Sequence, residues 1–360
     1  MKAFSIAASC LLAAQPGLAA DDLGISRAGP ANSTLAHVER HVLPPYPENE
    51  RMRGQEGWVV LSYVVNPDGS VADPIVENSS GQAGFERAAL KAAAATRYSP
   101  ATVDGKPVEQ CATRVRYLFA IKGVPRGATS RFRSNFKDIR ALIDAGALDQ
   151  AESRIDENLK TGTSNLYEVS RLLLLRYDLC RKQGDKPCQL ASLEQAVTGG
   201  GDFLEPALYR GVLEAMATLQ VEAQLFGDAL SSIEKRDELK PHLEAGHPLR
   251  IAAGQIRDAI AGDKELVFDG RVAFRSGCGT DRPNHQHQLM RREFSVIPQS
   301  GTVNEVEIRC DWRRTTDSVA PDKTWRIPDS WGDCQVFVFG DKDATFKLVE
   351  FPLVTSAATP

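Results

Sequence analysis

Outside its first residues, this chain has no apolar run long enough to cross a bilayer, and this absence excludes a protein with several membrane spans. The beginning of the chain differs. Lys2 precedes an apolar run over residues 3–14, and small residues then lead to Asp21 and Asp22. These are the charged, apolar and small-residue regions of a secretory signal peptide, and the run is shorter than the roughly 20 residues of a membrane span. We therefore predict a signal peptide over residues 1–20 and export from the cytoplasm, with membrane anchoring as the alternative.

The chain also lacks an excess of positive charge and the short motifs of common enzymes. Its 43 Lys and Arg residues are balanced by 47 Asp and Glu residues, and no basic patch stands out. Nucleic acid is therefore not an expected partner, because neutralising phosphates requires clustered cations. No GxSxG, Walker or Rossmann motif occurs. The sequence predicts a protein without a catalytic site and without a small-molecule cofactor.

Metal-binding cysteine spacings are absent, although the chain has seven cysteines. In an exported protein the cysteines left after processing are disulfide candidates. Cys180 and Cys188 flank a turn between two expected helices, so we predict that they are bonded. Cys310 and Cys334 lie at the end of one expected strand and the start of another, and we pair them next. The remaining two cysteines, whose pairing stays open, are Cys111 and Cys278.

His285 and His287 are the residues nearest to a metal motif, but no cysteine or group of carboxylates completes a site around them. We interpret them as part of an exposed polar loop, with a metal site as the alternative. Three tryptophans near the C-terminus pose a similar choice between a ligand groove and a core position. Core or interface positions are the expectation for Trp312, Trp325 and Trp331.

The first region with strong periodicity predicts two strands, a helix and a third strand. Residues 56–65 alternate between apolar and other side chains, and the turn at residues 66–69 predicts that residues 70–78 fold back as a hairpin. Residues 85–97 are rich in helix formers, and the helix stops before Pro100. Residues 112–121 alternate again and form the third expected strand.

The same region carries a series of short sequences in a fixed order. These are Pro45 to Pro47, then residues 54–57, 59–65, 67–69, 79–81, 85–90, 97–101 and 105–107. Their order and composition resemble those of the TonB C-terminal family. The resemblance implies a ββαβ domain over residues 42–122.

This resemblance implies binding rather than catalysis. Family members grip a short segment of an outer-membrane transporter by adding it as a strand to their sheet. Carried over to this chain, the offered edge is the strand at residues 112–121, with Arg116 as the outward position that suits an exposed edge. The partner-binding residues that the resemblance implies are Tyr46, Pro47, Tyr98, Thr113, Arg114, Arg116 and Leu118.

The chain departs from that family in two respects. It has neither an uncleaved N-terminal membrane helix nor a long proline-rich span, which a working energy transducer requires. In addition, residues 122–360 follow a domain that normally ends its chain. We therefore do not expect energy transduction, although the fold is expected.

Residues 131–262 carry helical periodicity interrupted by short turns. Turns are expected at Gly146, Gly184 and Gly227. We interpret this region as degenerate helical hairpins that loosely resemble tetratricopeptide repeats, with a bundle without repeats as the alternative.

Residues 265–354 return to strand periodicity. The expected strands are residues 265–274, 288–297 and 302–312, followed by a closing hairpin over residues 335–350. The predicted fold class is thus an α+β multidomain chain, with the ββαβ domain first, helical hairpins next and an antiparallel β-domain last.

The leading hypothesis is a periplasmic, transport-associated protein that binds segments of periplasmic or outer-membrane proteins by strand addition. The second hypothesis is a scaffold in which the helical repeats carry recognition, and the third is an enzyme that uses the β-domain. A free edge at residues 112–121 separates the first two hypotheses. The sequence does not determine the partner or the oligomeric state.

Overall fold

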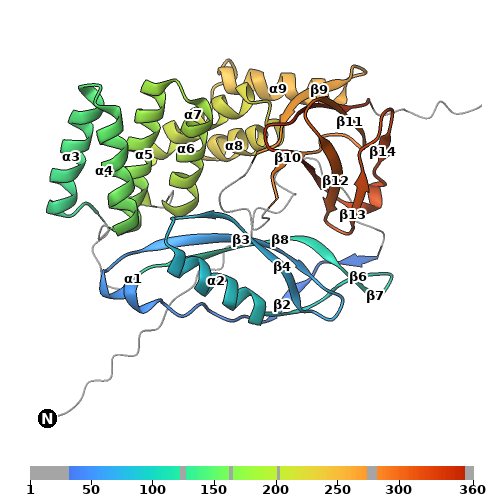
Figure 1. Ribbon diagram of the computed structural model, residues 1–360, viewed down its shortest axis with the longest axis horizontal. Helices are drawn as coiled ribbons and strands as arrows, with labels where there is room; N and C mark the ends of the chain where they lie inside the picture. Colours follow the sequence, from blue (N-terminus) through green and yellow to red (C-terminus); the bar gives the residue numbers. More distant parts are fainter. Residues whose placement is uncertain (1–31, 122–126, 162–164, 201–202, 274–281, 353–360) are drawn as a thin grey trace, which may run out of the picture.

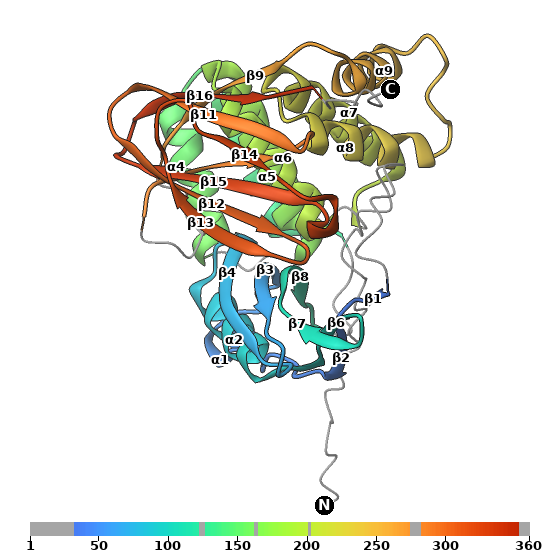
Figure 2. The same ribbon diagram turned by 90° about the vertical axis from the view of Figure 1, so that its right-hand side faces the viewer.

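The computed structural model describes residues 32–121, 127–161, 165–200, 203–273 and 282–352. The predicted signal peptide at residues 1–20 lies outside them. The chain forms an α/β unit, a row of helices and a β-domain, in this order (Figure 1). The helices and the β-domain lie side by side on one side of the first unit (Figures 1 and 2). The predicted fold class, α+β with this order of regions, is confirmed.

The first unit is a three-stranded antiparallel sheet covered on one face by a helix. The strand order is β4 (Val71–Ser79), β3 (Gly57–Val65) and β8 (Gln110–Phe119), and α2 (Ala83–Ala95) is the covering helix. Shorter elements complete the unit. They are β1 (Ser33–Thr34), β2 (His37–Arg40), α1 (Glu48–Met52), β5 (Arg97–Ser99), β6 (Ala101–Val103) and β7 (Lys106–Val108).

The hairpin between β3 and β4 turns at Gly69, where only glycine fits. Its φ of +77° is unfavourable for other residues, and a Cβ atom there would lie 1.9 Å from the carbonyl oxygen of Tyr98. This close approach lets Tyr98 N donate a hydrogen bond of 2.9 Å to the carbonyl of Gly69. The turn is thereby attached to β5.

The central strand β3 is buried on both faces. On one face, Val59 and Leu61 pack with Phe85 of α2. On the other face, Trp58 and Val60 pack with residues of the helical region. The sheet is therefore the middle layer between α2 and the helices above it (Figure 1).

Consecutive helices of the second region pack against each other along the chain (Figure 1). Their bounds are α3 (Ser130–Asp144), α4 (Leu148–Thr161), α5 (Leu166–Gln183), α6 (Lys186–Gly200), α7 (Pro206–Glu222), α8 (Phe226–Glu238) and α9 (Pro248–Ala261). The side chains of Thr129 and Asn165 accept hydrogen bonds at the starts of α3 and α5. The likeness to tetratricopeptide repeats stays a prediction.

Two of the three expected glycine turns are found. Gly146 and Gly184 have φ values of +76° and +72° at helix ends, as a left-handed cap requires. The expected turn at Gly227 is wrong, because this residue lies in the first turn of α8 and the chain reverses at Gln224, with φ of +58°. A Cβ atom at Gly227 would lie 3.0 Å from the terminal methyl group of Met290, so the glycine allows close packing against the β-domain.

The β-domain consists of two four-stranded antiparallel sheets that share one core. One sheet has the order β10 (Asn284–Gln288), β15 (Cys334–Gly340), β12 (Val303–Cys310) and β13 (Arg314–Ser318). The other has the order β14 (Thr324–Arg326), β11 (Glu293–Ser300), β16 (Thr345–Glu350) and β9 (Leu266–Arg271). A short 3₁₀ helix, η3 (Asp329–Trp331), precedes β15.

Two expectations for this domain are wrong. The single strand expected at residues 288–297 is split between β10 and β11, because Met290 N and Arg291 N turn to donate hydrogen bonds to the buried carboxylate of Glu350. The closing hairpin expected at residues 335–350 does not form either, since β15 and β16 belong to different sheets. Alternating side chains predict a strand, but they do not determine its partner.

His285 and His287 lie in β10 rather than in an exposed loop, which corrects that expectation. His287 is buried, and its Nε2 lies 2.7 Å from Oε1 of Glu350. His285 packs edge-on against Phe346. Trp325 is buried and stacked on Phe294, as expected for a core tryptophan.

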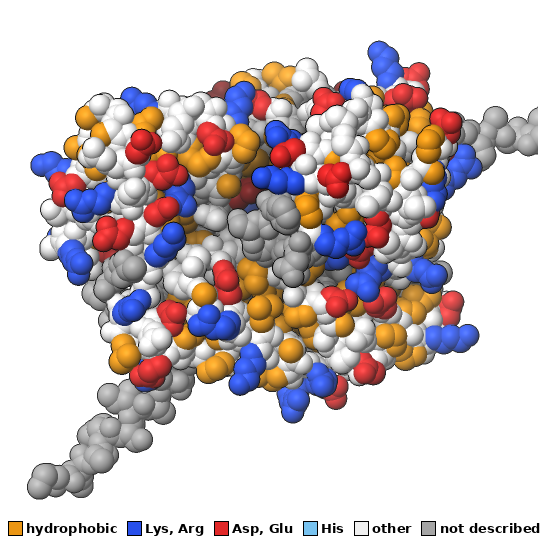
Figure 3. Space-filling view, in the orientation of Figure 1, with side chains coloured by type: hydrophobic (Ala, Val, Ile, Leu, Met, Phe, Trp, Pro, Cys, Tyr) orange, Lys and Arg blue, Asp and Glu red, His pale blue; other side chains and the backbone are white. Residues whose placement is uncertain are grey.

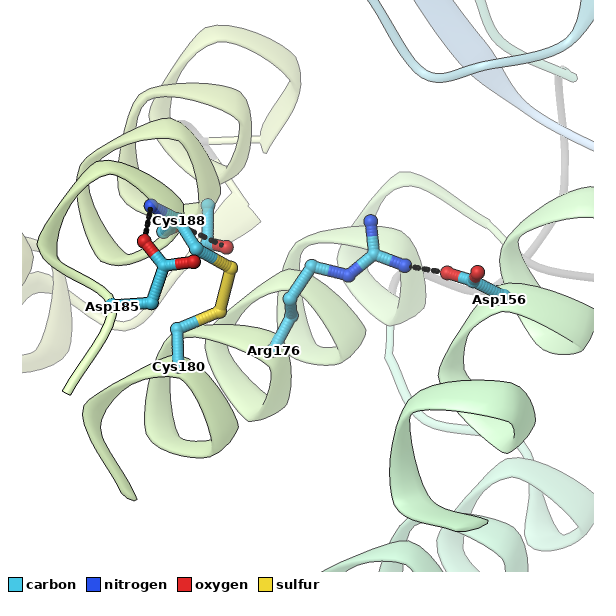
Figure 4. The surroundings of a disulfide bond; sticks show 6 residues. Asp156, Arg176, Cys180, Asp185 and Cys188 are labelled. Atoms are coloured by element: carbon cyan, nitrogen blue, oxygen red, sulfur yellow. Dashed lines mark hydrogen bonds and ion pairs between the residues drawn. A yellow bond between two sulfur atoms is a disulfide. The ribbon is translucent and has the colours of Figure 1, made fainter. Parts of the chain in front are cut away.

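Both expected disulfides are present. Cys180 near the end of α5 is bonded to Cys188 at the start of α6 (Figure 4). Beside this bond, the Asp185 carboxylate accepts a hydrogen bond of 2.9 Å from Cys188 N. Cys310 and Cys334 are bonded across the neighbouring strands β12 and β15. Cys278 lies outside the described residues.

Candidate functional site: the outer strand of the first sheet

The strand β8 lies at one edge of the sheet, and its outward backbone groups follow from the pairing of β3. The Trp58 carbonyl accepts a hydrogen bond of 3.0 Å from Ser80 N, so the backbone groups of Trp58 are directed toward β4. Backbone groups alternate in direction along a strand, so those of Val59 are directed toward β8, where Val59 pairs with Tyr117. The positions between the paired ones point away from the sheet. These are Arg114, Arg116 and Leu118.

The C-terminal β-domain bounds this edge at its first residues. Cys111 N donates a hydrogen bond of 3.2 Å to the carbonyl of Asp311, which follows β12. Nearby, Arg314 of β13 forms an ion pair of 3.0 Å with Asp73 of β4. Within the described residues, the remainder of β8, residues 113–119, pairs with β3 alone. This part of β8 is about seven residues long, or roughly 23 Å at about 3.3 Å per residue.

Side chains at the outward positions point toward the helical region. The guanidinium of Arg116 donates a hydrogen bond of 2.9 Å to the Thr198 carbonyl in the last turn of α6. Leu118 packs beside Trp58 and Val60. The side chains of Arg116 and Leu118 therefore connect the first unit to the helical region. At these two positions only the backbone groups are directed away from the sheet, toward a strand partner.

Sequence comparison connects this unit with known proteins. Residues 42–121 match the family model described as Gram-negative bacterial TonB protein C-terminal. The resemblance to the TonB C-terminal family is confirmed for this segment. The match places the sheet, α2 and the edge strand β8 within one TonB-like domain.

Two relatives show the extent of the similarity. Protein TonB of Haemophilus ducreyi is 37% identical over 62 residues, which are 17% of this chain and 22% of that protein. The chain thus spans about a fifth of the length of that curated relative. The solution NMR structure of the Pseudomonas aeruginosa TonB CTD is 29% identical, and the match covers 27% of this chain and 97% of that one with a TM-score of 0.24.

Arg114 is the most exposed of the predicted binding residues in the TonB-like domain. Its side chain is 61% exposed and forms an ion pair of 2.5 Å with Glu77 of β4. Such an exposed pair contributes little to stability, about 0–1 kcal/mol. Thr113 is half-buried, and its hydroxyl accepts a hydrogen bond of 3.2 Å from Gln110 Nε2.

Tyr46 and Pro47 hold the segment that crosses the α2 side of the TonB-like domain. The Tyr46 ring packs edge-on against Phe85 and Phe119 at 5.6 and 5.8 Å between centroids. Its hydroxyl donates a hydrogen bond to the Gln55 carbonyl. Pro47 is the residue before α1. Tyr46 therefore packs on the core with its ring, and only the exposed part of this half-buried side chain is available to a partner.

Tyr98 is buried beneath the same face. Its hydroxyl lies 2.5 Å from the hydroxyl of Tyr63, and burial raises the pKa of both phenols. Two neutral phenols that share a hydrogen bond stabilise the core, and neither is presented to a partner. The structure thus gathers Arg114, Arg116 and Leu118 at the edge and separates Tyr98 from it.

Glu56 is a residue that sequence reasoning missed. Its buried carboxylate accepts hydrogen bonds of 2.7 Å from Ile121 N and 3.0 Å from Leu166 N, so it joins the end of the TonB-like domain to the first turn of α5. These partners lie 65 and 110 positions away in the chain. No local pattern marks such a residue.

Two other kinds of site are absent from the described part of the chain. No group of three or more His, Cys, Asp or Glu residues is placed to hold a metal ion there. In the same residues, no helix combines the length and apolar character that a membrane span requires.

Proposed function

We propose that this chain is a transport-associated protein of the cell envelope that binds an extended segment of a partner protein along β8. The observation that carries the proposal is the position of β8 at the sheet edge in a domain similar to the TonB C-terminal family. An edge strand offers unpaired N–H and C=O groups, and a partner strand gains affinity by pairing with them.

The partner expected from the family resemblance is a short segment of an outer-membrane transporter. Export through the signal peptide at residues 1–20 would bring the protein to the periplasm, where such segments are accessible. Since the bound segment pairs with backbone groups, the proposal requires outward N–H groups along β8, at positions such as Arg114 and Leu118. It does not require the side chains of β8, of which those of Arg116 and Leu118 contact the helical region.

Proline substitution tests this proposal because it removes a backbone donor. Arg114→Pro is the better variant, since the Arg114 side chain is exposed and loses only its ion pair with Glu77. We expect at least a tenfold loss of affinity for synthetic peptides that copy periplasm-facing segments of outer-membrane transporters, measured by fluorescence anisotropy.

The matched control is Arg114→Ala, which removes the same side chain and keeps the N–H group. It should bind the peptides with nearly wild-type affinity. The pair Arg116→Pro and Arg116→Ala repeats the comparison at the next outward position, where the alanine variant reports the cost of losing the contact with Thr198. If a folded Arg114→Pro protein binds as the wild type does, recognition does not use this edge, and the scaffold hypothesis with helical recognition replaces it.

A further inference from the structure

A second strand edge opens into a groove in the C-terminal β-domain, far in sequence from β8. The groove has a volume of about 640 Å³. Its lining includes Val296, Ile297 and Pro298 of β11, Thr324 of β14 and Val349 of β16. It lies where the short strand β14 has ended and β11 continues.

The backbone of Val296 is directed into this groove. The backbone carbonyl of Arg292 accepts a hydrogen bond of 2.7 Å from Ile327 N on the β14 side. The backbone carbonyl of Glu293 accepts one of 2.8 Å from Phe351 N on the β16 side. Because directions alternate along a strand, the N–H and C=O groups of Val296 are directed to the β14 side. Pairing with β14 stops at Ser295, so within the described residues Val296 has no strand partner there.

The groove continues over the outer face of the same sheet, where exposed apolar side chains lie beside the ion pair of Lys347 with Asp269. Ile297 and Val267 remain 45% and 42% exposed, unusual values for large apolar side chains in strands. Ser295 pairs with Val349, and Val349 pairs with Val267, so these positions share the outer face with Ile297. An extended segment that pairs with Val296 would lay its side chains on this surface.

Two carboxylates give the groove a negative charge. Glu265 and Asp322 line it, both are exposed, and neither forms an ion pair among the described residues. The one cation of the lining, Lys323, is neutralised by Asp317 at 2.7 Å. A segment that binds here is therefore expected to carry positive charge.

We propose that this groove binds an extended peptide segment in which basic and apolar side chains alternate. The segment pairs with the backbone of Val296, packs apolar side chains over the exposed Ile297, and places a cation near Glu265 and Asp322. Pro298, the next position directed to the edge, has no N–H group, so pairing ends there and the bound segment is short. The proposal is independent of binding at β8.

The test uses the full exported chain and a fluorescein-labelled synthetic hexapeptide of alternating lysine and valine. Anisotropy should show saturable binding, and the double variant Glu265→Lys with Asp322→Lys should weaken it at least tenfold. Glu152→Lys, at an exposed position of α4, is the matched charge control and should leave the affinity unchanged. Circular dichroism verifies that each variant is folded.

Strand pairing is tested separately by changing the peptide rather than the protein. N-methylation at alternate peptide bonds removes donors without changing charge, and one of the two methylation registers should lose at least tenfold in affinity. Equal binding of both registers would overturn strand pairing, and wild-type affinity of the double lysine variant would overturn the site itself. Absence of saturable binding up to about 1 mM peptide, an affinity of about −4 kcal/mol or weaker, would also overturn the proposal.

Discussion

At the scale of single residues, the buried carboxylate of Glu350 joins three residues at the end of β10 and in the turn after it. It is fully buried and accepts hydrogen bonds from Met290 N at 3.0 Å and Arg291 N at 2.6 Å, beside His287. The guanidinium of Arg291 in turn donates to carbonyls at the end of α9, including Ala259 at 2.7 Å. One residue cluster thereby ends a strand and joins the β-domain to the helices.

We predict that Glu350→Gln destabilises the protein by about 2–3 kcal/mol. A neutral amide oxygen is a weaker acceptor than a carboxylate for the hydrogen bonds from Met290 N and Arg291 N, and the amide nitrogen then has to face Nε2 of His287. Urea unfolding measures the change. Lys347→Ala on the same strand removes an exposed ion pair with Asp269 and should change the stability by less than about 1 kcal/mol. Equal stabilities of the two variants would contradict this account of the cluster.

The thiol of Cys111 predicts how stability depends on pH at this contact between domains. Burial, with the nearby charge of Glu109, raises its pKa from the ordinary 9.0 to about 12. The unfolded chain loses the proton first, so the stabilising effect is complete below about pH 9 and is lost as the pH rises toward 12.

We therefore expect Cys111→Ala to lose less stability than the wild type between pH 8 and about pH 11, measured by urea unfolding at each pH. Burial also raises the pKa of Tyr117 to about 12, so both proteins should share a background loss from this phenol. The difference between the two curves isolates the thiol. Parallel curves would show that the thiol does not contribute.

At the scale of elements, the TonB-like domain supplies partners for the ends of helices. Gln82 Nε2 donates to the Leu159 carbonyl of α4 at 2.9 Å, and Arg116 donates to Thr198 of α6. The Glu56 carboxylate instead lies at the start of α5. The side-chain donors thus lie at helix C-termini, where carbonyl groups are unpaired and the helix dipole is negative. The carboxylate lies at a helix N-terminus, where N–H groups are unpaired and the dipole is positive.

The disulfide between α5 and α6 is a second feature that connects elements (Figure 4). We predict that replacing both cysteines, by Cys180→Ala with Cys188→Ser, lowers stability by about 2–3 kcal/mol through the entropy of the opened loop. Thermal unfolding measures the loss, and peptide mapping of the wild type should find the two residues joined. The same unfolding temperature with and without the bond would contradict the prediction.

At the scale of the whole molecule, the helical region covers the sheet face opposite α2. Trp58 and Val60 pack there with Leu166, Val169 and Leu173. The face of the molecule in Figure 3 shows acidic and basic side chains mixed, without a continuous patch of one sign. Apolar packing of Trp58 and Val60, together with the hydrogen bonds of Glu56, Gln82 and Arg116, holds the helices on the sheet.

A fragment of residues 32–121 should consequently self-associate, because removing the helices exposes Trp58, Val60 and Leu118 on one face. Sedimentation velocity of this fragment should show dimers or larger species at micromolar concentration. The same fragment with Val60→Thr and Leu118→Thr should shift toward monomer. A fragment that is monomeric without these changes would show that the cover is not needed for solubility.

Much of the local structure was predictable from the sequence. The alternation of residues 56–65, the turn before β4 and the helix after Ser79 all appear in the expected order. The pairing of Cys180 with Cys188 was also predictable, because the two residues flank one turn. The errors came at Gly227 and in the β-domain, where the same local pattern fits more than one arrangement of neighbours.

By itself, the sequence determined periodicity, turns, the nearby disulfide and the resemblance of residues 42–121 to the TonB C-terminal family, because each depends on residues close together in the chain. Only the tertiary structure decided which sheet each strand joins, which backbone groups of β8 and β11 are directed to an edge, and what covers Trp58. His287 and Glu350 are 63 positions apart, and Glu56 and Leu166 are 110 apart. Such contacts form only when distant elements pack together, and no pattern within one element contains them.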